Sequence, residues 1–275
     1  MPTGIRITED KKRQVIETYS KSPMTLTELS KLSGLSNPTI IKILDEYNVE
    51  RYKKAQIFNP ELDECYFDVI DKESKAYFLG LIITDGNVFS PKDGNRQRSI
   101  SITQSSSDEY ILEIFKNEIK SNTSIVHDGR GCSQIAVRSN MMADSLERYG
   151  IVPNKTLTTK LPLLSEEYMP HLVRGILDGD GNIKAHQTNI KNRYAHALSF
   201  CGTYQLMHDL NEYLHNEVNV ERQKIYSYLD KHLSEIKWQS KDNMKKICDW
   251  MYANATIYLT RKHDIYLDFI NHYYS

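Results

Sequence analysis

The chain has 275 residues, which is more than one small domain needs and enough for a sizeable core. Its 35 lysine and arginine residues are balanced by 36 aspartate and glutamate residues, so the chain as a whole is not a polybasic nucleic-acid-binding protein. The scattered cysteines argue against a zinc site or a disulfide framework: Cys65, Cys132, Cys201 and Cys248. The first residues lack an apolar signal segment and no apolar run reaches the length of a membrane span, so we expect a cytoplasmic protein.

Residues 7–49 carry the patterns of three short helices. The second begins with a capping box formed by Thr25 and Glu28, and a turn at Gly34 separates it from the third. A short helix, a glycine-bearing turn and a second amphipathic helix are typical of a helix-turn-helix module. In such a module the start of the second helix enters the DNA major groove. We therefore expect contacts to bases or phosphates from Asn37, Thr39 and Lys42.

The alternative for this segment is a three-helix packing unit that binds nothing. The polar, capped start of its third helix favours DNA binding. A basic connector at residues 51–56 follows, and the acidic residues 57–73 beyond it are poorly suited to lie on DNA. We therefore expect a helix-turn-helix domain with a basic linker over residues 1–56.

One motif occurs twice, as FLGLIITDGN at residues 78–87 and as VRGILDGDGN at residues 173–182. In both copies a glycine precedes a small residue by four positions, which pairs Gly80 with Thr84 and Gly175 with Gly179. Residues four apart share one face of a helix, so each motif helix would present a bare stripe that permits close packing. We therefore expect the two motif helices to pack on each other.

An aspartate ends each apolar run, Asp85 in the first and Asp180 in the second, and a glycine suited to a left-handed helix cap follows. A carboxylate at this end of the helix dipole is unfavourable by about 0.3–1 kcal/mol, which predicts a cation nearby. Helices packed side by side would bring the carboxylates together, and their oxygens suit Mg²⁺ or Mn²⁺. We therefore expect a metal site at Asp85, Asp180 and the adjoining Gly86 and Gly181. The alternative, two ordinary capping aspartates, accounts poorly for the repetition.

The acidic alternation of the second motif could also suggest a calcium loop of the EF-hand type beginning at Asp178. The sixth position of such a loop needs glycine but holds Ile183, and the twelfth needs glutamate but holds Asn189. The sequence therefore does not indicate that type of site.

The order of predicted helices and strands is repeated as well. Helix, two strands, helix, two strands and helix follow one another over residues 57–160 and again over residues 161–275. In one such strand Ile100 and Ile102 would point inward while Thr103 points outward. We expect an α+β fold of two pseudo-symmetric αββαββα units, each with a four-stranded antiparallel sheet covered by helices on one face.

The sheet faces left uncovered would be rich in hydrogen-bond donors. Such side chains pair with guanine, adenine or phosphate, and a two-stranded ribbon fits the DNA major groove. An ordinary hydrated sheet face is the alternative, but it accounts poorly for the scarcity of carboxylates at residues 182–196. The residues expected to contact DNA are Arg96, Arg98, Gln134 and Arg138 in the first unit and Lys184, His186, Gln187, Asn189, Arg193, Lys224, Tyr226 and Lys237 in the second.

The paired motifs and the αββαββα order around them resemble the single-chain LAGLIDADG homing endonucleases over about residues 70–275. This resemblance implies a monomeric, site-specific double-strand DNA endonuclease of a mobile genetic element. The penultimate acidic residue of each motif binds divalent metal in that family, which corresponds to Asp85 and Asp180. Asp178 receives no metal role, because its counterpart in the first motif is Ile83.

The resemblance also implies catalytic residues around the metal. A glutamine often ends the second strand in this family, and Gln104 matches it, whereas the second repeat has Gly202 nearby. A lysine commonly follows the final helix of each repeat, at the places of Lys155 and Lys262 here. The alternative for either lysine is an ordinary surface position.

Three other functions use the same scaffold. Bacterial sporulation regulators resemble the combination of modules, but their DNA module comes last and their acidic positions are typically lost. An intron RNA maturase would bind structured RNA in preference to duplex DNA. An intein is disfavoured, because the chain neither begins with Cys or Ser nor ends in His-Asn followed by a nucleophile. The expected setting is the cytosol of a bacterial or phage host.

Overall fold

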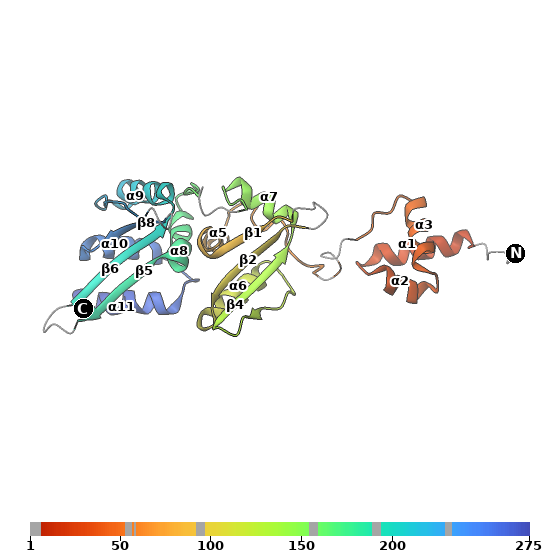
Figure 1. The fold of residues 1–275 in the computed structure, drawn as a ribbon, viewed down its shortest axis with the longest axis horizontal. Coiled ribbons are helices and arrows are strands. Elements are labelled where there is room, and N and C mark those ends of the chain that lie inside the picture. The colour runs from red at the N-terminus through yellow and green to blue at the C-terminus, as the bar shows by residue number, and fades with distance from the viewer. Residues whose placement is uncertain are drawn as a thin grey trace. The chain divides into compact units, whose positions relative to one another are not determined.

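The structure is a computed structural model that describes residues 7–52, 57, 59–91, 97–153, 159–188, 194–228 and 233–275 (Figure 1). The chain divides into two compact units, Met1–Leu62 with Lys120–Asn122 and Asp63–Ile119 with Thr123–Ser275. The boundary expected at residue 56 lies outside the described residues. No helix in these ranges is long and apolar enough to cross a membrane.

The first unit contains three helices, α1 Glu9–Lys21, α2 Leu26–Ser33 and α3 Asn37–Glu46. The expected capping box closes the start of α2, because the Thr25 hydroxyl accepts from the Glu28 amide and the Glu28 carboxylate accepts from the Thr25 amide. Gly34 adopts the left-handed backbone, with φ of 73°, that ends α2 before the turn. The three helices enclose a small apolar core of Val15, Tyr19, Leu29, Ile40, Ile43 and Leu44.

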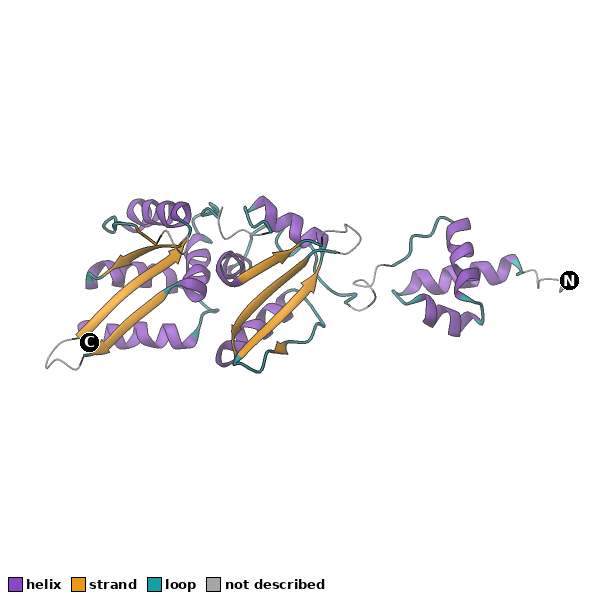
Figure 2. Cartoon of the chain, viewed as in Figure 1, coloured by secondary structure: helices purple, strands orange, loops and turns teal. Residues whose placement is uncertain are grey.

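The second unit contains the two expected repeats, and both sheets are antiparallel with four strands (Figure 2). In the first repeat the sheet order is β1-β2-β4-β3. Its elements are α5 Glu73–Asp85, β1 Gly86–Phe89, β2 Ser99–Ser105, the 3-10 turn η1 Ser106–Asp108, α6 Glu109–Glu118, β3 Val126–His127, β4 Cys132–Arg138 and α7 Asn140–Arg148.

In the second repeat the sheet order is β5-β6-β8-β7. Its elements are α8 Met169–Asp180, β5 Asn182–Gln187, β6 Tyr194–Gly202, α9 Tyr204–Val218, β7 Tyr226–Tyr228, β8 Leu233–Trp238, α10 Lys241–Tyr252 and α11 Thr260–Tyr274. The sequence analysis did not predict α11. Its start carries no capping side chain, since Leu259 occupies the N-cap position, so the local signal for a helix start is weak.

The central strands alternate as their sequences predict. Ile100 pairs with Val137 and Ile102 pairs with Ile135, and all four side chains are buried on the face that the helices cover. Gln134, the neighbour of Ile135 on β4, is exposed on the opposite face. The α+β fold with two antiparallel sheets is therefore confirmed.

The two motif helices pack directly on each other, as expected, and lie between the two sheets (Figure 1). A Cβ atom on Gly80 would lie 2.1 Å from the Leu172 carbonyl oxygen, and one on Gly175 would lie 2.1 Å from the Tyr77 carbonyl oxygen. The backbones are thus in contact, which only glycine permits at these two positions. The repeated glycine of the motif therefore determines how α5 and α8 cross.

The glycines after the two aspartates do not form the left-handed caps that the sequence predicted. Gly86 has φ of −87° and Gly181 has φ of −90°, and both are extended because each helix continues directly into a strand. A Cβ atom on Gly86 would lie 2.6 Å from the Cα atom of Ile82. Glycine is needed here because the strand passes close to the end of its own helix.

A candidate catalytic centre at the ends of the motif helices

The last residues of α5 and α8 are Asp85 and Asp180. The Asp85 carboxylate reaches across to the neighbouring helix, because a Cβ atom on Gly179 would lie 3.3 Å from its Oδ2. Gly179 directly precedes Asp180, so the crossing of the helices brings the Asp85 carboxylate next to the last turn of α8, which ends at Asp180.

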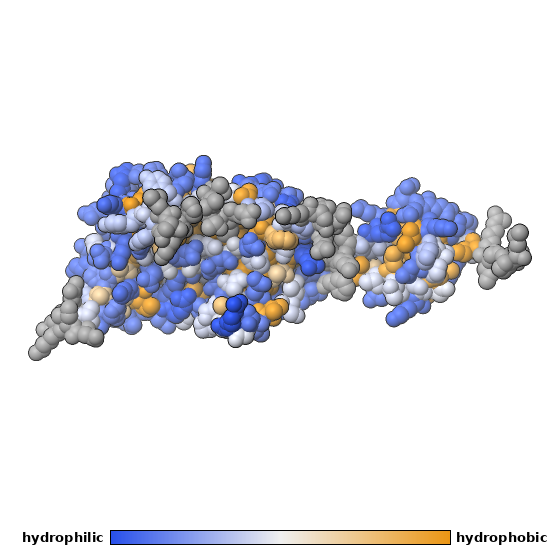
Figure 3. Space-filling view, in the orientation of Figure 1, coloured by the Kyte–Doolittle hydropathy of each residue, from blue (hydrophilic) through white to orange (hydrophobic). Residues whose placement is uncertain are grey.

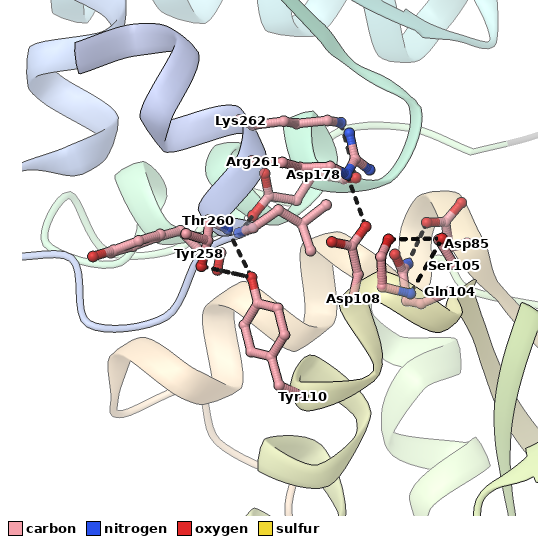
Figure 4. Close-up of polar contacts among 12 residues, drawn as sticks. Asp85, Gln104, Ser105, Asp108, Tyr110, Asp178, Tyr258, Thr260, Arg261 and Lys262 are labelled. Atoms are coloured by element: carbon pink, nitrogen blue, oxygen red, sulfur yellow. Dashed lines mark hydrogen bonds and ion pairs between the residues drawn. The ribbon is translucent and has the colours of Figure 1, made fainter. Parts of the chain in front are cut away.

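Gln104 lies on β2 and points to Asp85 (Figure 4). Its side chain is buried, and its amide nitrogen donates a hydrogen bond to Oδ2 of Asp85. Gln104 shares the strand face of Ile100 and Ile102, so the strand alternation aims it inward. The predicted glutamine is thus next to the first aspartate.

The second repeat has glycine at the equivalent position. Gln104 pairs with Ser133 of β4, and Gly202 pairs with Ser234 of β8, so the two residues occupy matching places in the two sheets. A Cβ atom on Gly202 would lie 2.9 Å from Cδ2 of Leu206. The second repeat therefore offers no side-chain amide from this point of its sheet.

Cys201 lies beside the second aspartate. Burial raises the pKa of its thiol to about 11, and the charges of Glu235 and Asp180 act in the same direction. Cys201 pairs with Glu235 across β6 and β8. Cys201 and Glu235 are therefore paired in the second sheet at the place where the first sheet pairs Thr103 with Gln134.

Lys262 is buried in the first turn of α11 and caps the end of α8. Its ammonium donates to the carbonyl oxygens of Leu177 at 2.5 Å, Asp178 at 2.9 Å and Gly181 at 2.7 Å. Burial lowers the pKa of Lys262 to about 8, although nearby carboxylates oppose this shift. Lys262 is therefore a cation at the C-terminal end of the α8 dipole, as the sequence predicted for such an end.

One of the expected metal ligands is already engaged. The Gly181 carbonyl oxygen accepts a hydrogen bond from the Lys262 ammonium, which uses one of its two lone pairs. Its role in a metal site stays a prediction, as does that of Gly86. The other expected lysine, Lys155, lies outside the described residues.

Asp178 is buried at the contact between the repeats. Its Oδ2 accepts hydrogen bonds of 2.8 Å from the Tyr77 hydroxyl and of 2.8 Å from the Leu259 amide. Burial raises the pKa of Asp178, and these hydrogen bonds and the Lys262 charge oppose the shift. These contacts join the second motif helix to Tyr77 of the first motif helix and to the segment before α11.

The sequence analysis missed a second polar contact between the repeats. Arg174 is fully buried, and its Nη2 donates to Oε1 of Glu73 at 2.6 Å. Its remaining nitrogens donate to the carbonyl oxygens of Ile257 and Met251. Burial raises the pKa of Glu73, but hydrogen bonds from Thr256 and the Arg174 charge outweigh it and lower the pKa. The sequence did contain a signal for this contact, because Arg174 is a charged residue inside the otherwise apolar start of the second motif.

Further contacts join the first repeat to the start of α11 (Figure 4). Nε of Arg261 lies 2.8 Å from Oδ2 of the buried Asp108. The Tyr110 hydroxyl donates to the Tyr258 carbonyl at 2.9 Å and accepts from the Thr260 amide at 2.7 Å. The position of Lys262 is thus supported from the first repeat.

Several residues expected to contact DNA lie on the uncovered sheet faces. Exposed outward positions are Gln134 and Arg138 on β4, Lys184 and His186 on β5, Tyr226 on β7 and Lys237 on β8. Lys224 is exposed just before β7, with its ammonium 5.2 Å from the centre of the Tyr226 ring. Figure 3 shows one face of the molecule, where hydrophilic residues predominate and apolar ones are scattered.

Two expected contacts lie elsewhere. Arg98 forms ion pairs with Asp144 and Glu147 of α7. It lies two residues before Ile100, so its side chain points to the same, helix-covered face of the sheet. Gln187 lies four residues after Ile183 on β5, so both side chains point to the helix-covered face of the second sheet. Arg96, Asn189 and Arg193 lie outside the described residues.

The uncovered faces also carry residues that the sequence analysis did not select. Phe89 and Val126 are exposed there, together with the partly exposed Glu235. Strand parity and pairing could have identified them, because Phe89 pairs with the outward Ser99.

In the first unit the three selected residues lie on α3, Asn37 and Thr39 in its first turn and Lys42 near its middle. Lys42 is exposed. Oγ1 of Thr39 is hydrogen-bonded to Oγ of Ser36 at 2.9 Å. Oδ1 of Asn37 is buried, so only part of this side chain faces solvent. Lys42 is therefore the most accessible of the three for an external partner.

Comparison with solved structures shows what the second unit resembles. The LAGLIDADG meganuclease I-AabMI bound to uncleaved DNA matches with a TM-score of 0.51 and 13% identity, over 71% of this chain and 88% of that one. The I-SmaMI LAGLIDADG homing endonuclease bound to cleaved DNA matches with a TM-score of 0.52 and 13% identity. This match covers 74% of this chain and 88% of that one. I-SmaMI bound to its uncleaved DNA target in the presence of calcium ions matches with a TM-score of 0.52 and 13% identity. This match covers 74% of this chain and 90% of that one.

No protein-family profile matches the chain, and no curated protein sequence does. The structural likeness, at 13% identity, carries the assignment of the fold. The chain has the fold of the LAGLIDADG homing endonucleases, in the arrangement of two repeats on one chain.

Proposed function

We propose that the protein is a site-specific endonuclease that hydrolyses both strands of duplex DNA at a divalent-metal site between Asp85 and Asp180. One observation supports this proposal: α5 and α8 cross so that the Asp85 carboxylate lies against Gly179, the residue that precedes Asp180 at the end of α8. Two carboxylates in one place repel each other unless a cation joins them. The solved structures of the same fold include complexes with DNA, which supports a DNA substrate.

The residues fit a hard divalent cation, Mg²⁺ or Mn²⁺. The carboxylates at the ends of the two motif helices would be its side-chain ligands. Mg²⁺ commonly binds through one or two carboxylates and takes its other ligands from water and phosphate. When bound, such an ion activates water and stabilises the charge that develops on the phosphodiester oxygens.

The surrounding residues have distinct roles in this proposal. Gln104 orients Asp85, and Lys262 holds the end of α8 that carries Asp180. Outward residues such as Arg138 and Lys184 would bind phosphates or base edges. The three-helix unit would add affinity or site length through Lys42 at the start of α3.

The test begins by finding the target. A plasmid library of genomic fragments is incubated with the full chain and Mg²⁺, and linearised plasmids are recovered and sequenced. Asp85→Asn and Asp180→Asn should each abolish cleavage of the recovered site while changing its binding less than about threefold, since each removes one carboxylate and keeps the shape. The matched control is Asp268→Asn, an exposed aspartate on α11.

Wild-type cleavage by either motif variant would disprove the assignment of the centre. Tight duplex binding without cleavage by the wild-type chain would instead indicate a regulator on the same scaffold. Preference for structured intron RNA over duplex DNA would indicate a maturase.

A further inference from the structure

We propose that Glu235 is a specificity-determining residue that selects cytosine in one half of the DNA target, at the place where Gln134 of the first repeat selects adenine. This inference rests on the proposed endonuclease function and deepens it, because it names two base pairs that the target contains. The register of the two sheets places both residues at equivalent points. On β8, Glu235 pairs with Cys201 of β6 (Figure 1). On β4, Gln134 pairs with Thr103 of β2.

Both points lie at the end of the sheet that is nearer the motif aspartates. β1 begins directly after Asp85, and its first residue pairs with the residue before Thr103. β5 begins two residues after Asp180, and its first residue pairs with the residue two positions before Cys201. The base pairs within reach of the two side chains are therefore those near the centre, at equal distances from the middle of the target.

Glu235 points to the uncovered face of the second sheet. Its neighbour Ile236 is buried with Phe200 on the helix-covered side, so the strand alternation turns Glu235 outward and leaves it partly exposed. The Tyr228 hydroxyl donates to Oε2 of Glu235 at 3.4 Å, which restricts the rotation of the carboxylate. Basic side chains are exposed on the same face, at Lys184 and Lys237. Glu235 is thus an oriented acceptor on a face whose neighbouring lysines suit phosphate.

A carboxylate on this face has a restricted choice of partners in DNA. It accepts hydrogen bonds but donates none, and it repels phosphate, so only a base that presents a donor can bind it. In the major groove guanine and thymine present acceptors, and adenine presents a donor beside the acceptor N7. Cytosine presents its N4 donor alone. Glu235 therefore selects cytosine and disfavours the other three bases.

Gln134 suits a different base. Its Nε2 donates to Oγ1 of Thr103 at 2.9 Å, which fixes the orientation of the amide. The second N–H group and the carbonyl oxygen of the amide match N7 and N6 of adenine. The target is therefore asymmetric at these two positions, with adenine in the half bound by the first repeat and cytosine in the half bound by the second.

Selection from a library of random duplexes tests this assignment by binding alone. The full wild-type chain is incubated with the library without divalent metal, and the bound duplexes are sequenced. We expect one position in one half of the selected site to favour cytosine by roughly 5- to 100-fold, the range for a good contact to a base edge. Glu235→Gln keeps the shape and adds a donor, so it should move the preference at that position toward adenine and leave the other positions unchanged.

The reciprocal variant is Gln134→Glu. It should move the preference from adenine to cytosine at the position equally far from the middle of the site on the other side. Glu217→Gln, at an exposed glutamate of α9, is the matched control and should change no preference. Lys237→Met, on the same face of β8 as Glu235, should weaken the binding of all sequences to a similar extent and keep the cytosine preference.

Unchanged base preferences in Glu235→Gln would overturn the inference. An equal gain in affinity for every sequence would do so as well, because the carboxylate would then act only as a repelling charge. The selected site is finally incubated with Mg²⁺ and wild-type chain. Cytosine selection without cleavage would uphold the inference while the proposed hydrolysis failed, and cleavage indifferent to the bases at both positions would overturn the inference alone. A wild-type chain that bound no duplex would refute both.

Discussion

The buried guanidinium of Arg174 lies 2.6 Å from the carboxylate of Glu73, and this ion pair joins α8 of the second repeat to the first residue of α5 in the other. The ion pair thus ties the start of α5 to the middle of α8, next to the close backbone contacts of Gly80 and Gly175. Asp85 and Asp180 lie at the C-terminal ends of the same helices. The geometry of the proposed centre therefore depends on contacts made far from it in the sequence.

Breaking this ion pair should destabilise the protein. Removing one partner of a buried pair typically costs about 3–5 kcal/mol, because the other charge is left without compensation. We expect Arg174→Met and Glu73→Gln each to lower the free energy of unfolding, measured by urea denaturation. The double variant should lose less than the sum of the two. Strict additivity would contradict a direct coupling.

The same pair predicts an acid dependence. The folded-state pKa of Glu73 lies below its unfolded value of 4.5, so its contribution is complete above that value and is lost as the pH falls through the folded-state pKa. The stability difference between wild type and Glu73→Gln should therefore be largest at neutral pH and shrink below about pH 4.5. Urea titrations at several pH values measure it. If the stability difference between wild type and Glu73→Gln grew as the pH fell, the pKa of Glu73 would be raised in the folded protein, which would contradict this prediction.

Any side chain at the helix crossing should be poorly tolerated. Gly80→Ala and Gly175→Ala each place a Cβ atom 2.1 Å from a backbone carbonyl oxygen, which can retreat only if the helices separate. Overpacking of this kind costs about 1–3 kcal/mol and at times more. Thermal and urea unfolding should show the loss, and cleavage should fall with it. Asn117→Ala, at an exposed position of α6, should leave both unchanged.

Lys262 should act on the centre through the end of α8. Lys262→Met removes three hydrogen bonds from an ammonium group, each worth roughly 1.5–3 kcal/mol in favourable cases, and leaves buried carbonyl oxygens unsatisfied. We expect lower stability and slower cleavage with DNA binding largely retained. Lys245→Met, which loses only a partly exposed ion pair with Asp249, should cost at most about 1 kcal/mol. Full cleavage activity in Lys262→Met would show that Lys262 does not act on the centre through the end of α8.

Arginines on opposite faces of the first sheet should differ in their effect on DNA binding. Arg138→Ala should weaken duplex binding and reduce the salt dependence of the affinity by about one unit of slope, because an outward arginine would neutralise a phosphate. Arg98→Ala should leave DNA affinity unchanged and instead lower stability, since Arg98 pairs with α7. Fluorescence anisotropy at several salt concentrations tests both. Equal loss of affinity would contradict the assignment of the faces.

Local patterns in the sequence determined much of this protein. The repeated spacing of glycine and small residues specified two helices that pack closely, and the alternation of Ile100 and Ile102 specified which strand face is buried. These features depend on the periods of helix and strand, which are visible within a few residues. The position of each aspartate at the end of its helix follows in the same way.

Only the tertiary structure decided how those pieces meet. It placed Lys262 of α11 on the carbonyl oxygens of α8, buried Arg174 against Glu73, and turned Arg98 toward α7 rather than outward. Each of these contacts joins residues far apart in the chain. The choice of partner depends on burial and packing, which the helix and strand periodicities of the sequence do not predict. The register of the two sheets likewise decides that Gly202 in the second repeat occupies the place of Gln104 in the first.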